Sequence, residues 1–164
     1  FRVMRKKKHI RHALTRTRRG RPAKDEYFLE IAEVVASRAT CPRLHVGTVV
    51  VKDNMVISTG YNGAPRGLAH CDDVGCRLVN GHCTRIVHSE LNALLQAAYH
   101  GVSTKGATLY TLYMPCENCA KAIINAGIKR VVFRDIYKNI DQPYTRELFK
   151  QAGIKVVQLP KGKK

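Results

Sequence analysis

Two short motifs carry the side chains best suited to chemistry, His88-Ser89-Glu90 and Pro115-Cys116-Glu117-Asn118-Cys119. Each stands where a strand or loop is expected to run into a helix. Cys116 and Cys119 are three residues apart, so in the first turn of a helix their sulfur atoms point the same way. Together with the His88 imidazole they form three ligands suited to zinc, and a fourth tetrahedral position is left for water. The pattern is that of an open, catalytic metal site.

Glu90 is expected to move protons rather than to bind the metal. On an ideal helix it would lie about 200° around the axis from His88, so the two can share a site only where the helix begins. Placed there, the carboxylate can take a proton from the activated water and hand it to a ring nitrogen and to departing ammonia. The two motifs match the signature of zinc nucleobase deaminases, whose Glu is not a ligand. The alternative is half of a structural zinc site, which would need a fourth protein ligand.

Hydrophobic periodicity and turn residues predict nine elements that position these motifs. Leu91, Leu94, Leu95 and Ala98, for example, fall on one side of the helix that carries Glu90. Strands separated by helices imply parallel crossovers, so an α/β fold with a mixed five-stranded sheet covered by helices is expected. The predicted helices are 25–38, 88–100, 116–126 and 143–152, and the predicted strands are 46–52, 55–59, 108–113, 130–133 and 155–159.

Length and charge indicate one domain, residues 25–164, preceded by a basic extension, residues 1–24. The 164-residue chain has a formal charge of +17, but residues 1–24 hold eleven Lys or Arg and no acidic residue. The remaining part has a charge of only +6. The extension could bind nucleic-acid phosphates, act as a targeting address or be a solvated tail. There is no run of about 18 apolar residues, so a membrane-spanning helix is not expected.

The six cysteines favour metal over disulfides, because they cluster with His in a chain without a recognisable secretion signal. We therefore expect a reducing, cytoplasmic location. Residues 60–87 are too polar for a core and too long for a featureless connection. A second, structural zinc could organise this loop. Its expected ligands are Cys41, Cys71, Cys76 and Cys83, with His70 or His82 able to replace one cysteine; free buried cysteines are the alternative.

Beyond the zinc motif, the chain resembles the deoxycytidylate (dCMP) deaminase family from about residue 25 to the last strand. The resemblance rests on the segments 41–47 (CPRLHVG), 58–67 (STGYNGAPRG) and 88–93 (HSELNA). It implies the three-layer α/β/α cytidine-deaminase-like fold. It also implies zinc-dependent hydrolysis of dCMP to dUMP and ammonia, which would supply dUMP for thymidylate synthesis. Ser89 stands where the family more often has Ala, and its small side chain should be tolerated.

The resemblance also suggests binding residues and partners. Asn62 could bond the sugar 3′-hydroxyl, and Gly63 would let the backbone approach a ligand. The 5′-phosphate needs a cation, for which Arg43, Arg66, Arg85 and Lys121 are candidates. Tyr113 could stack on the pyrimidine or belong to the core. Family members are often hexamers controlled by dCTP and dTTP, although Tyr99 departs from the polar residue that some relatives place near the effector site.

Two other functions remain open at this point. A deaminase acting on a base in RNA or DNA would use residues 1–24 as its phosphate-binding arm, with a steep dependence on salt. A noncatalytic zinc-stabilised binding protein, of the kind associated with competence, would keep only the fold. The intact Glu90 argues against the second.

Overall fold

The computed structural model describes residues 20–137 and 143–161, so most of the basic extension, residues 1–19, lies outside the described part. All nine predicted elements are present, with ends that shift by at most two residues. Three further short elements lie in the 60–87 loop. The elements are α1 (Lys24–Ala36), β1 (Gly47–Lys52), β2 (Met55–Tyr61), α2 (Cys71–Val74), β3 (Leu78–Val79), β4 (His82–Cys83), α3 (Ser89–Tyr99), β5 (Thr108–Tyr113), α4 (Glu117–Asn125), β6 (Arg130–Asp135), α5 (Pro143–Gln151) and β7 (Lys155–Gln158).

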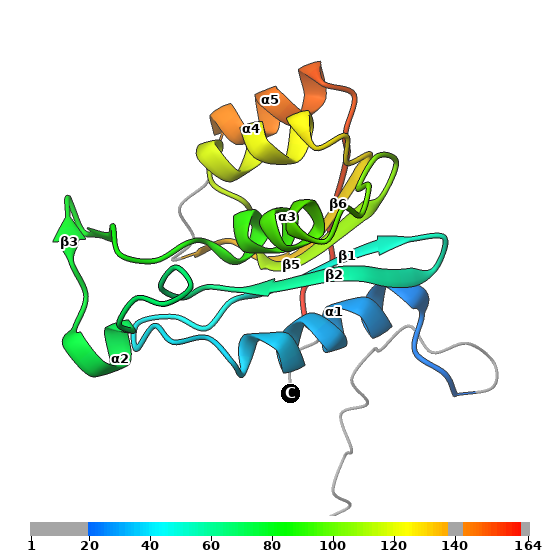
Figure 1. The fold of residues 1–164 in the computed structure, drawn as a ribbon. Helices are drawn as coiled ribbons and strands as arrows, with labels where there is room; N and C mark the ends of the chain where they lie inside the picture. Colours follow the sequence, from blue (N-terminus) through cyan, green and yellow to red (C-terminus); the bar gives the residue numbers. More distant parts are fainter. Residues whose placement is uncertain (1–19, 138–142, 162–164) are drawn as a thin grey trace, which may run out of the picture.

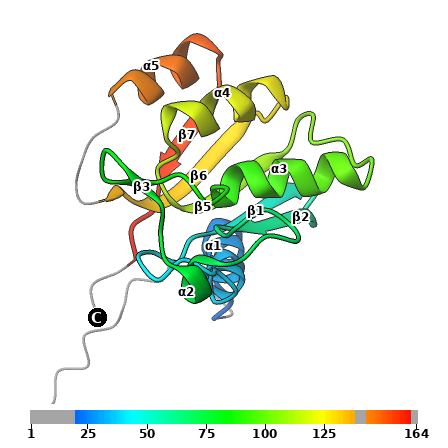
Figure 2. The same cartoon turned by 60° about the vertical axis from the view of Figure 1, so that its left-hand side comes forward.

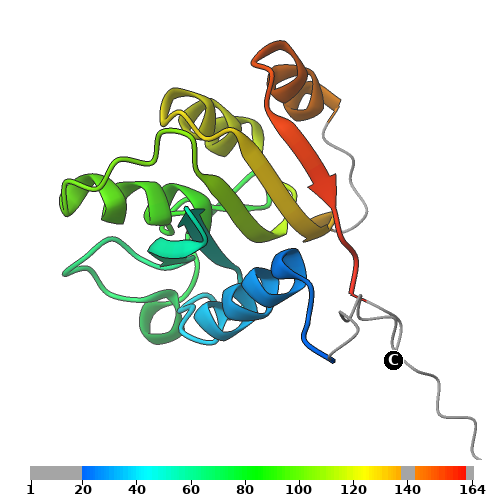
Figure 3. The same cartoon turned by 90° about the vertical axis from the view of Figure 1, so that its right-hand side faces the viewer.

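The middle layer is a five-stranded sheet in the order β2-β1-β5-β6-β7. Strand β1 is antiparallel to β2 and to β5, whereas β5, β6 and β7 are parallel, so the predicted mixed sheet is confirmed. Helix α1 covers one face, and α3, α4 and α5 cover the other (Figures 1 and 3). The three-layer α/β/α architecture is therefore confirmed. No helix in the described part of the chain is long and apolar enough to cross a bilayer.

The alternation of side chains along β1 builds two separate cores. Val49 and Val51 face α1 and pack with Phe28 and Leu29. Val50 points to the opposite face, into the core beneath α3, α4 and α5. Because side chains alternate along a strand, the fully buried Thr48 shares the face of Val50 and lies toward the N-terminal end of α3.

Three ion pairs join α1 to strand β6. The Arg134 guanidinium donates from Nη1 and Nη2 to the two carboxylate oxygens of Glu26, both at 2.7 Å, and both side chains are buried. Its Nη2 atom also lies 3.3 Å from Oε1 of Glu33. Arg130 donates two bonds to Asp25, at 2.7 and 2.6 Å. Bidentate pairs fix direction as well as distance, so α1 is held at both ends of β6.

The buried face of α3 contains only one of its three leucines, and its other residues there are mostly small. Ala93, Leu94 and Ala97 are buried, whereas Leu91, Leu95 and Ala98, which helped to predict the helix, are exposed. The reason is the close approach of α3 to β2. A Cβ atom on Gly60 would lie 2.3 Å from the Ala93 nitrogen and 2.4 Å from the Ser89 oxygen. Only glycine on the strand and short side chains on the helix allow that distance.

Candidate metal centres and active site

His88 and Cys116 occupy equivalent places, each the N-cap residue of its helix. Both have extended backbone angles, φ −66° and ψ 150° for His88 and φ −73° and ψ 168° for Cys116. N-caps are usually Ser, Thr, Asp or Asn, whose side chains bond the free N–H groups. Neither side chain makes that capping bond here. Both are instead directed to a common point between the two helix ends, as the motifs predict.

The three predicted ligands of the first site come together. The Nδ1 atom of His88 lies 3.5 Å from Sγ of Cys116 and 3.6 Å from Sγ of Cys119. A tetrahedral zinc ion with ordinary bond lengths separates sulfur and nitrogen ligands by about 3.6 Å. His88 is exposed, Cys116 half-buried and Cys119 buried, so the site opens to solvent on the histidine side. The donor set and its spacing fit a zinc ion with one side open.

Hydrogen bonding shifts the pKa values of the two thiols of this site in opposite directions. The hydrogen bond from Cys119, supported by His88, lowers the pKa of Cys116 to about 3 despite partial burial. The same bond and burial raise the pKa of Cys119. The bond to Cys116 also raises the pKa of His88. A zinc ion must displace the remaining protons to bind all three ligands, so the site exchanges protons for metal.

Glu90 lies beside the ligands but is not one of the cluster. It is buried in the first turn of α3, and burial raises the pKa of its carboxyl above the ordinary value. Its Oε2 atom accepts a hydrogen bond from the Ser89 hydroxyl at 3.1 Å and lies 4.0 Å from Sγ of Cys119. A carboxyl with a raised pKa next to a metal centre is suited to exchanging protons near neutral pH.

The three cysteines of the 60–87 loop form a second cluster. Donor atoms of Cys71, Cys76 and Cys83 lie within 4.8 Å of one another. The Cys71 and Cys83 sulfurs are 3.7 Å apart, against about 3.8 Å for two thiolates on tetrahedral zinc. Burial raises the pKa of Cys71 to about 12. Burial also acts to raise the pKa of Cys83. This effect is outweighed by hydrogen bonds from the backbone N–H groups of Arg85 and Arg77 and from the Cys71 thiol, so the pKa of Cys83 is lowered.

Cys41 lies near this cluster, close enough to help raise the pKa of Cys76, but it is not one of the three clustered cysteines. It is buried, but its sulfur does not meet the 4.8 Å spacing to all three other cysteines. His70 and His82, the suggested replacements, are exposed and also lie outside the cluster. The three clustered sulfurs thus offer a zinc ion three ligands, and the fourth is not fixed by this arrangement.

A two-residue hairpin brings Cys83 back to the cluster, and sequence reasoning missed it. Strands β3 and β4 pair Leu78 with Cys83, and the turn between them is Asn80-Gly81 with φ values of 50° and 78°. Asn-Gly with two positive φ angles is the strongest short-range signal for such a turn. The signal was present in the sequence. Figure 2 shows α2 and the β3 hairpin on the side of the molecule next to the start of α3.

Asn62 and Gly63 organise the loops that border His88. The Asn62 side chain is buried, accepts a bond from the Val46 N–H at 2.8 Å and donates to the Leu44 carbonyl at 2.7 Å. Its amide has a second N–H and a second lone pair, so these bonds leave capacity for a ligand. Gly63 forms a two-way bridge with Val87, next to His88. Both residues therefore connect the loops next to His88, and their predicted role in substrate binding stays a prediction.

The other predicted binding residues lie on several separate segments of the chain. Arg43 donates to the Gly81 carbonyl at 3.0 Å, which links the 41–47 segment to the β3–β4 turn. The Arg66 guanidinium stacks over the Tyr99 ring at 4.6 Å. Tyr113 ends β5 and packs edge-on against Tyr137, with 6.0 Å between ring centroids. Arg85 is half-buried and Lys121 exposed. These placements do not select one cation for a phosphate.

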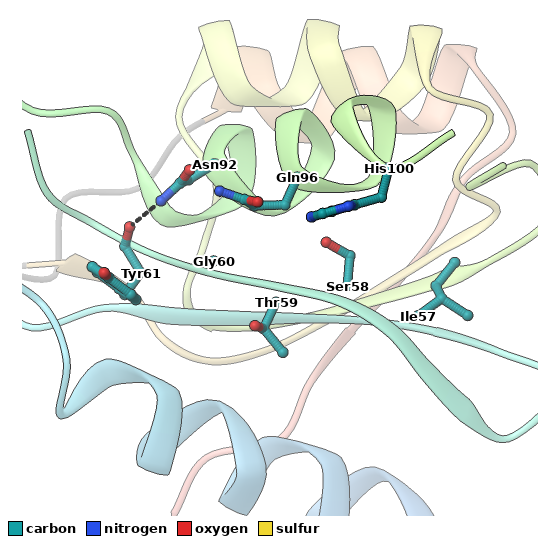
Figure 4. A pocket seen from close by; sticks show the side chains of 8 residues that line it. All are labelled: Ile57, Ser58, Thr59, Gly60, Tyr61, Asn92, Gln96 and His100. Atoms are coloured by element: carbon teal, nitrogen blue, oxygen red, sulfur yellow. Dashed lines mark hydrogen bonds between the residues drawn. The ribbon is translucent and has the colours of Figure 1, made fainter. Parts of the chain in front are cut away.

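A groove of about 290 Å³ lies between β2 and α3, away from both cysteine clusters. Ile57, Ser58, Thr59, Gly60 and Tyr61 form one wall, and Asn92, Gln96 and His100 form the other (Figure 4). The Asn92 amide donates to the Tyr61 carbonyl at 2.9 Å and closes one end. Since β2 is an edge strand, this groove is open to the exterior.

Comparison with known proteins identifies the family. Residues 22–135 match the family model described as cytidine and deoxycytidylate deaminase zinc-binding region. The chain is 46% identical over 135 residues to ComE operon protein 2 of Bacillus subtilis, covering 82% of this chain and 70% of that protein. It is 39% identical to the deoxycytidylate deaminase of Saccharomyces cerevisiae over 84% of this chain, but spans only 45% of that longer protein.

A solved structure resembles the whole described architecture. It is the dCMP deaminase of cyanophage S-TIM5 in complex with dCMP and dUMP, with a TM-score of 0.71 and 32% identity over 82% of this chain and 95% of that one. The family match, these identities and the placing of the two zinc motifs at facing helix ends agree. The chain belongs to the cytidine and deoxycytidylate deaminase family.

Proposed function

We propose that this chain hydrolyses dCMP to dUMP and ammonia with a catalytic zinc ion held by His88, Cys116 and Cys119. The observation that carries the proposal is the Glu90 carboxyl, which is buried beside the cluster of His88, Cys116 and Cys119. The substrate follows from the relatives, since the cyanophage structure is of a dCMP deaminase with dCMP and dUMP bound. The dUMP formed would feed thymidylate synthesis.

The proposed chemistry divides between the metal and Glu90. A zinc ion in this position supplies Lewis acidity, which makes water acidic enough to lose a proton near neutral pH. Glu90 takes that proton and delivers it to N3 of the cytosine ring as the water oxygen bonds to C4. A second proton passes through Glu90 to the exocyclic amine, the C4–N4 bond breaks, and ammonia leaves with dUMP as the other product. Proton transfer by a positioned carboxyl contributes about 10²- to 10⁴-fold to such a rate.

The decisive experiment measures ammonia release from dCMP, cytidine, dCTP and single-stranded DNA, with Glu90→Ala as the control. We expect turnover of dCMP that depends on Glu90. Turnover of single-stranded DNA with steep salt dependence, and none of dCMP, would favour a nucleic-acid deaminase that uses residues 1–24. Release of no ammonia from any substrate would favour a noncatalytic binding protein, and activity that survives the loss of Glu90 would refute the mechanism.

We also propose a second, structural zinc ion bound by Cys71, Cys76 and Cys83, with Cys41 as the fourth ligand. The spacing of the three clustered sulfurs supports the site, and the backbone N–H groups near Cys83 would stabilise its thiolate. Zinc thiolates require reduced cysteines, and all six cysteines are free. This chemistry suits a reducing compartment such as the cytoplasm.

Self-association is proposed through the outer face of α3. Leu91, Leu95 and Tyr99 follow one another at intervals of four residues and are 36%, 51% and 71% exposed. Residues at this spacing share one helix face, and such an apolar stripe is favoured at protein interfaces. The expected assembly is a homo-oligomer, most simply the hexamer of the family. Light scattering of the purified chain and of Leu95→Glu would test it, since a monomeric native chain would refute self-association.

Regulation by dCTP and dTTP is proposed for the groove between β2 and α3, which borders the same face. Its polar wall of Asn92, Gln96 and His100 could recognise a nucleotide. Titration of both triphosphates against the activity of the native chain and of Gln96→Ala would test this. A flat response of the native chain would refute it.

A further inference from the structure

A line of three buried hydroxyl groups leads from the centre of the sheet to Glu90. Thr48 on β1 and Thr111 on β5 are directly paired across the strands, and their Oγ1 atoms are 3.1 Å apart, with Thr48 placed as donor. The Thr48 Oγ1 atom is 2.8 Å from the Ser89 hydroxyl. Ser89 Oγ in turn lies 3.1 Å from Oε2 of Glu90. Both threonines and Ser89 are 0% exposed, so water does not compete for these contacts.

These hydroxyls border apolar core side chains. The next inward-facing residue on β1 is Val50 and the preceding one on β5 is Leu109, both fully buried in the core. A buried hydroxyl is costly unless it is bonded, and valine would fill nearly the same volume as threonine. The contact of Thr48 with Ser89, and through it with Glu90, points to a use beyond packing.

Ser89 is the link between the threonines and the carboxyl. Its hydroxyl donates to Oε2 of Glu90. The Thr48 Oγ1 atom lies on the other side of Ser89, within hydrogen-bond distance of the same hydroxyl. The direction in which the Ser89 hydroxyl meets Glu90 is therefore tied to strand β1.

We propose that Ser89 and Thr48 are positioning residues for the Glu90 carboxyl, which they hold in one orientation through their hydrogen-bonded hydroxyls. The inference rests on the proposed function, in which Glu90 carries protons between water and the cytosine ring. A carboxyl held in this way needs little reorganisation during reaction.

The test compares Ser89→Ala, Thr48→Val and the double variant with Thr48→Ser, which keeps the hydroxyl. Loss of a bond to a charged group in the transition state corresponds to a fall in kcat of about tenfold or more. We expect this fall in kcat in both Ser89→Ala and Thr48→Val. Their KM should stay within twofold of the native value, and their zinc content and thermal unfolding should be close to those of the native chain. The double variant should be no slower than Ser89→Ala, because both changes break one chain. Thr48→Ser should stay near native activity.

Three outcomes would overturn the proposal. Native kcat in Ser89→Ala would remove Ser89 from the mechanism, and equal losses in Thr48→Ser and Thr48→Val would assign the effect to packing. A loss that follows zinc content would assign it to the metal site. Absence of dCMP turnover in the native chain, or turnover that persists in Glu90→Gln, instead refutes the proposed function. A crystal structure of Ser89→Ala gives a readout independent of activity, since we expect the Glu90 carboxyl to leave its native orientation.

Discussion

The sulfur of Cys119 lies 4.0 Å from the Oε2 atom of Glu90, although the residues are 29 positions apart and stand on different helices. The carboxyl is thus next to a candidate metal ligand, and the same oxygen accepts a hydrogen bond from the Ser89 hydroxyl. Mutation can distinguish these two roles. Loss of a proton carrier removes activity alone, whereas loss of a metal ligand removes both zinc and activity.

Glu90→Gln should abolish the reaction without removing the metal. We expect kcat to fall by about 10²- to 10⁴-fold, because the amide keeps the shape of the side chain but cannot carry the proton. Zinc content, measured by atomic absorption, should equal that of the native chain. Cys119→Ala is the matched variant and should lose both zinc and activity. Loss of zinc in Glu90→Gln would show that the carboxylate is a ligand.

Replacing any one of Cys71, Cys76 and Cys83 by Ser should remove one zinc ion and leave the other. We expect about two ions in the native chain, since each cysteine cluster offers a separate set of ligands. Unfolding of the variants should begin at a lower temperature because the loop loses its cross-link. Cys41→Ser decides whether Cys41 is the fourth ligand, and His82→Ala is the control. One zinc ion in the native chain would contradict the second site.

Gly60→Ala should destabilise the fold more than the addition of a single methyl group suggests. The added Cβ would meet backbone atoms of α3 at 2.3 and 2.4 Å, and backbone cannot rotate away as a side chain can. Overpacking of this kind costs about 3 kcal/mol. Activity should fall as well, because α3 carries Glu90 and begins next to His88. Thr59→Ala at the exposed neighbouring position is the control for chemical denaturation, and equal midpoints for the two variants would refute the prediction.

Asp25→Asn should reduce stability in a pH-dependent way. The hydrogen bonds from Arg130, reinforced by Tyr110 and opposed by partial burial, lower the pKa of the Asp25 carboxyl. A depressed folded-state pKa means that the contribution is fully present above the unfolded value of about 3.9 and is lost as the pH falls through the folded value. At pH 7 we expect the free energy of unfolding of Asp25→Asn to be roughly 1–2 kcal/mol below that of the native chain, since the Asp25–Arg130 pair is about one-quarter exposed.

The measurement for this pair is urea unfolding of Asp25→Asn and the native chain between pH 7 and pH 3. The two free energies of unfolding should converge toward the acidic end. Glu30→Gln, on the exposed side of the same helix, is the control and should track the native chain throughout. A deficit that stays constant down to pH 3 would show that the carboxylate charge is not its source.

The sequence by itself determined the chemistry and the order of the elements. His88, Glu90, Cys116 and Cys119 are specified by residue type and short spacing, and each stands at a boundary that local turn and helix signals predict. The mixed sheet follows from the order of strands and crossover helices. The position of Cys83 could also have been predicted, because Asn80-Gly81 is a local signal for the hairpin that brings Cys83 close to Cys71.

Only the tertiary structure decided the relationships between residues far apart in the chain. The leucines of α3 predict a helix correctly, but the close approach to Gly60 determines that Ala93 and Ala97 are buried beside Leu94 while Leu91 and Leu95 are exposed. Likewise, Thr48, Thr111 and Ser89 are unremarkable in sequence until strand pairing and helix packing place their hydroxyls in line with Glu90. Local spacing in the sequence predicts helices, strands and motifs. Contacts between distant segments depend on how closely the layers pack, and that packing is a property of the whole fold.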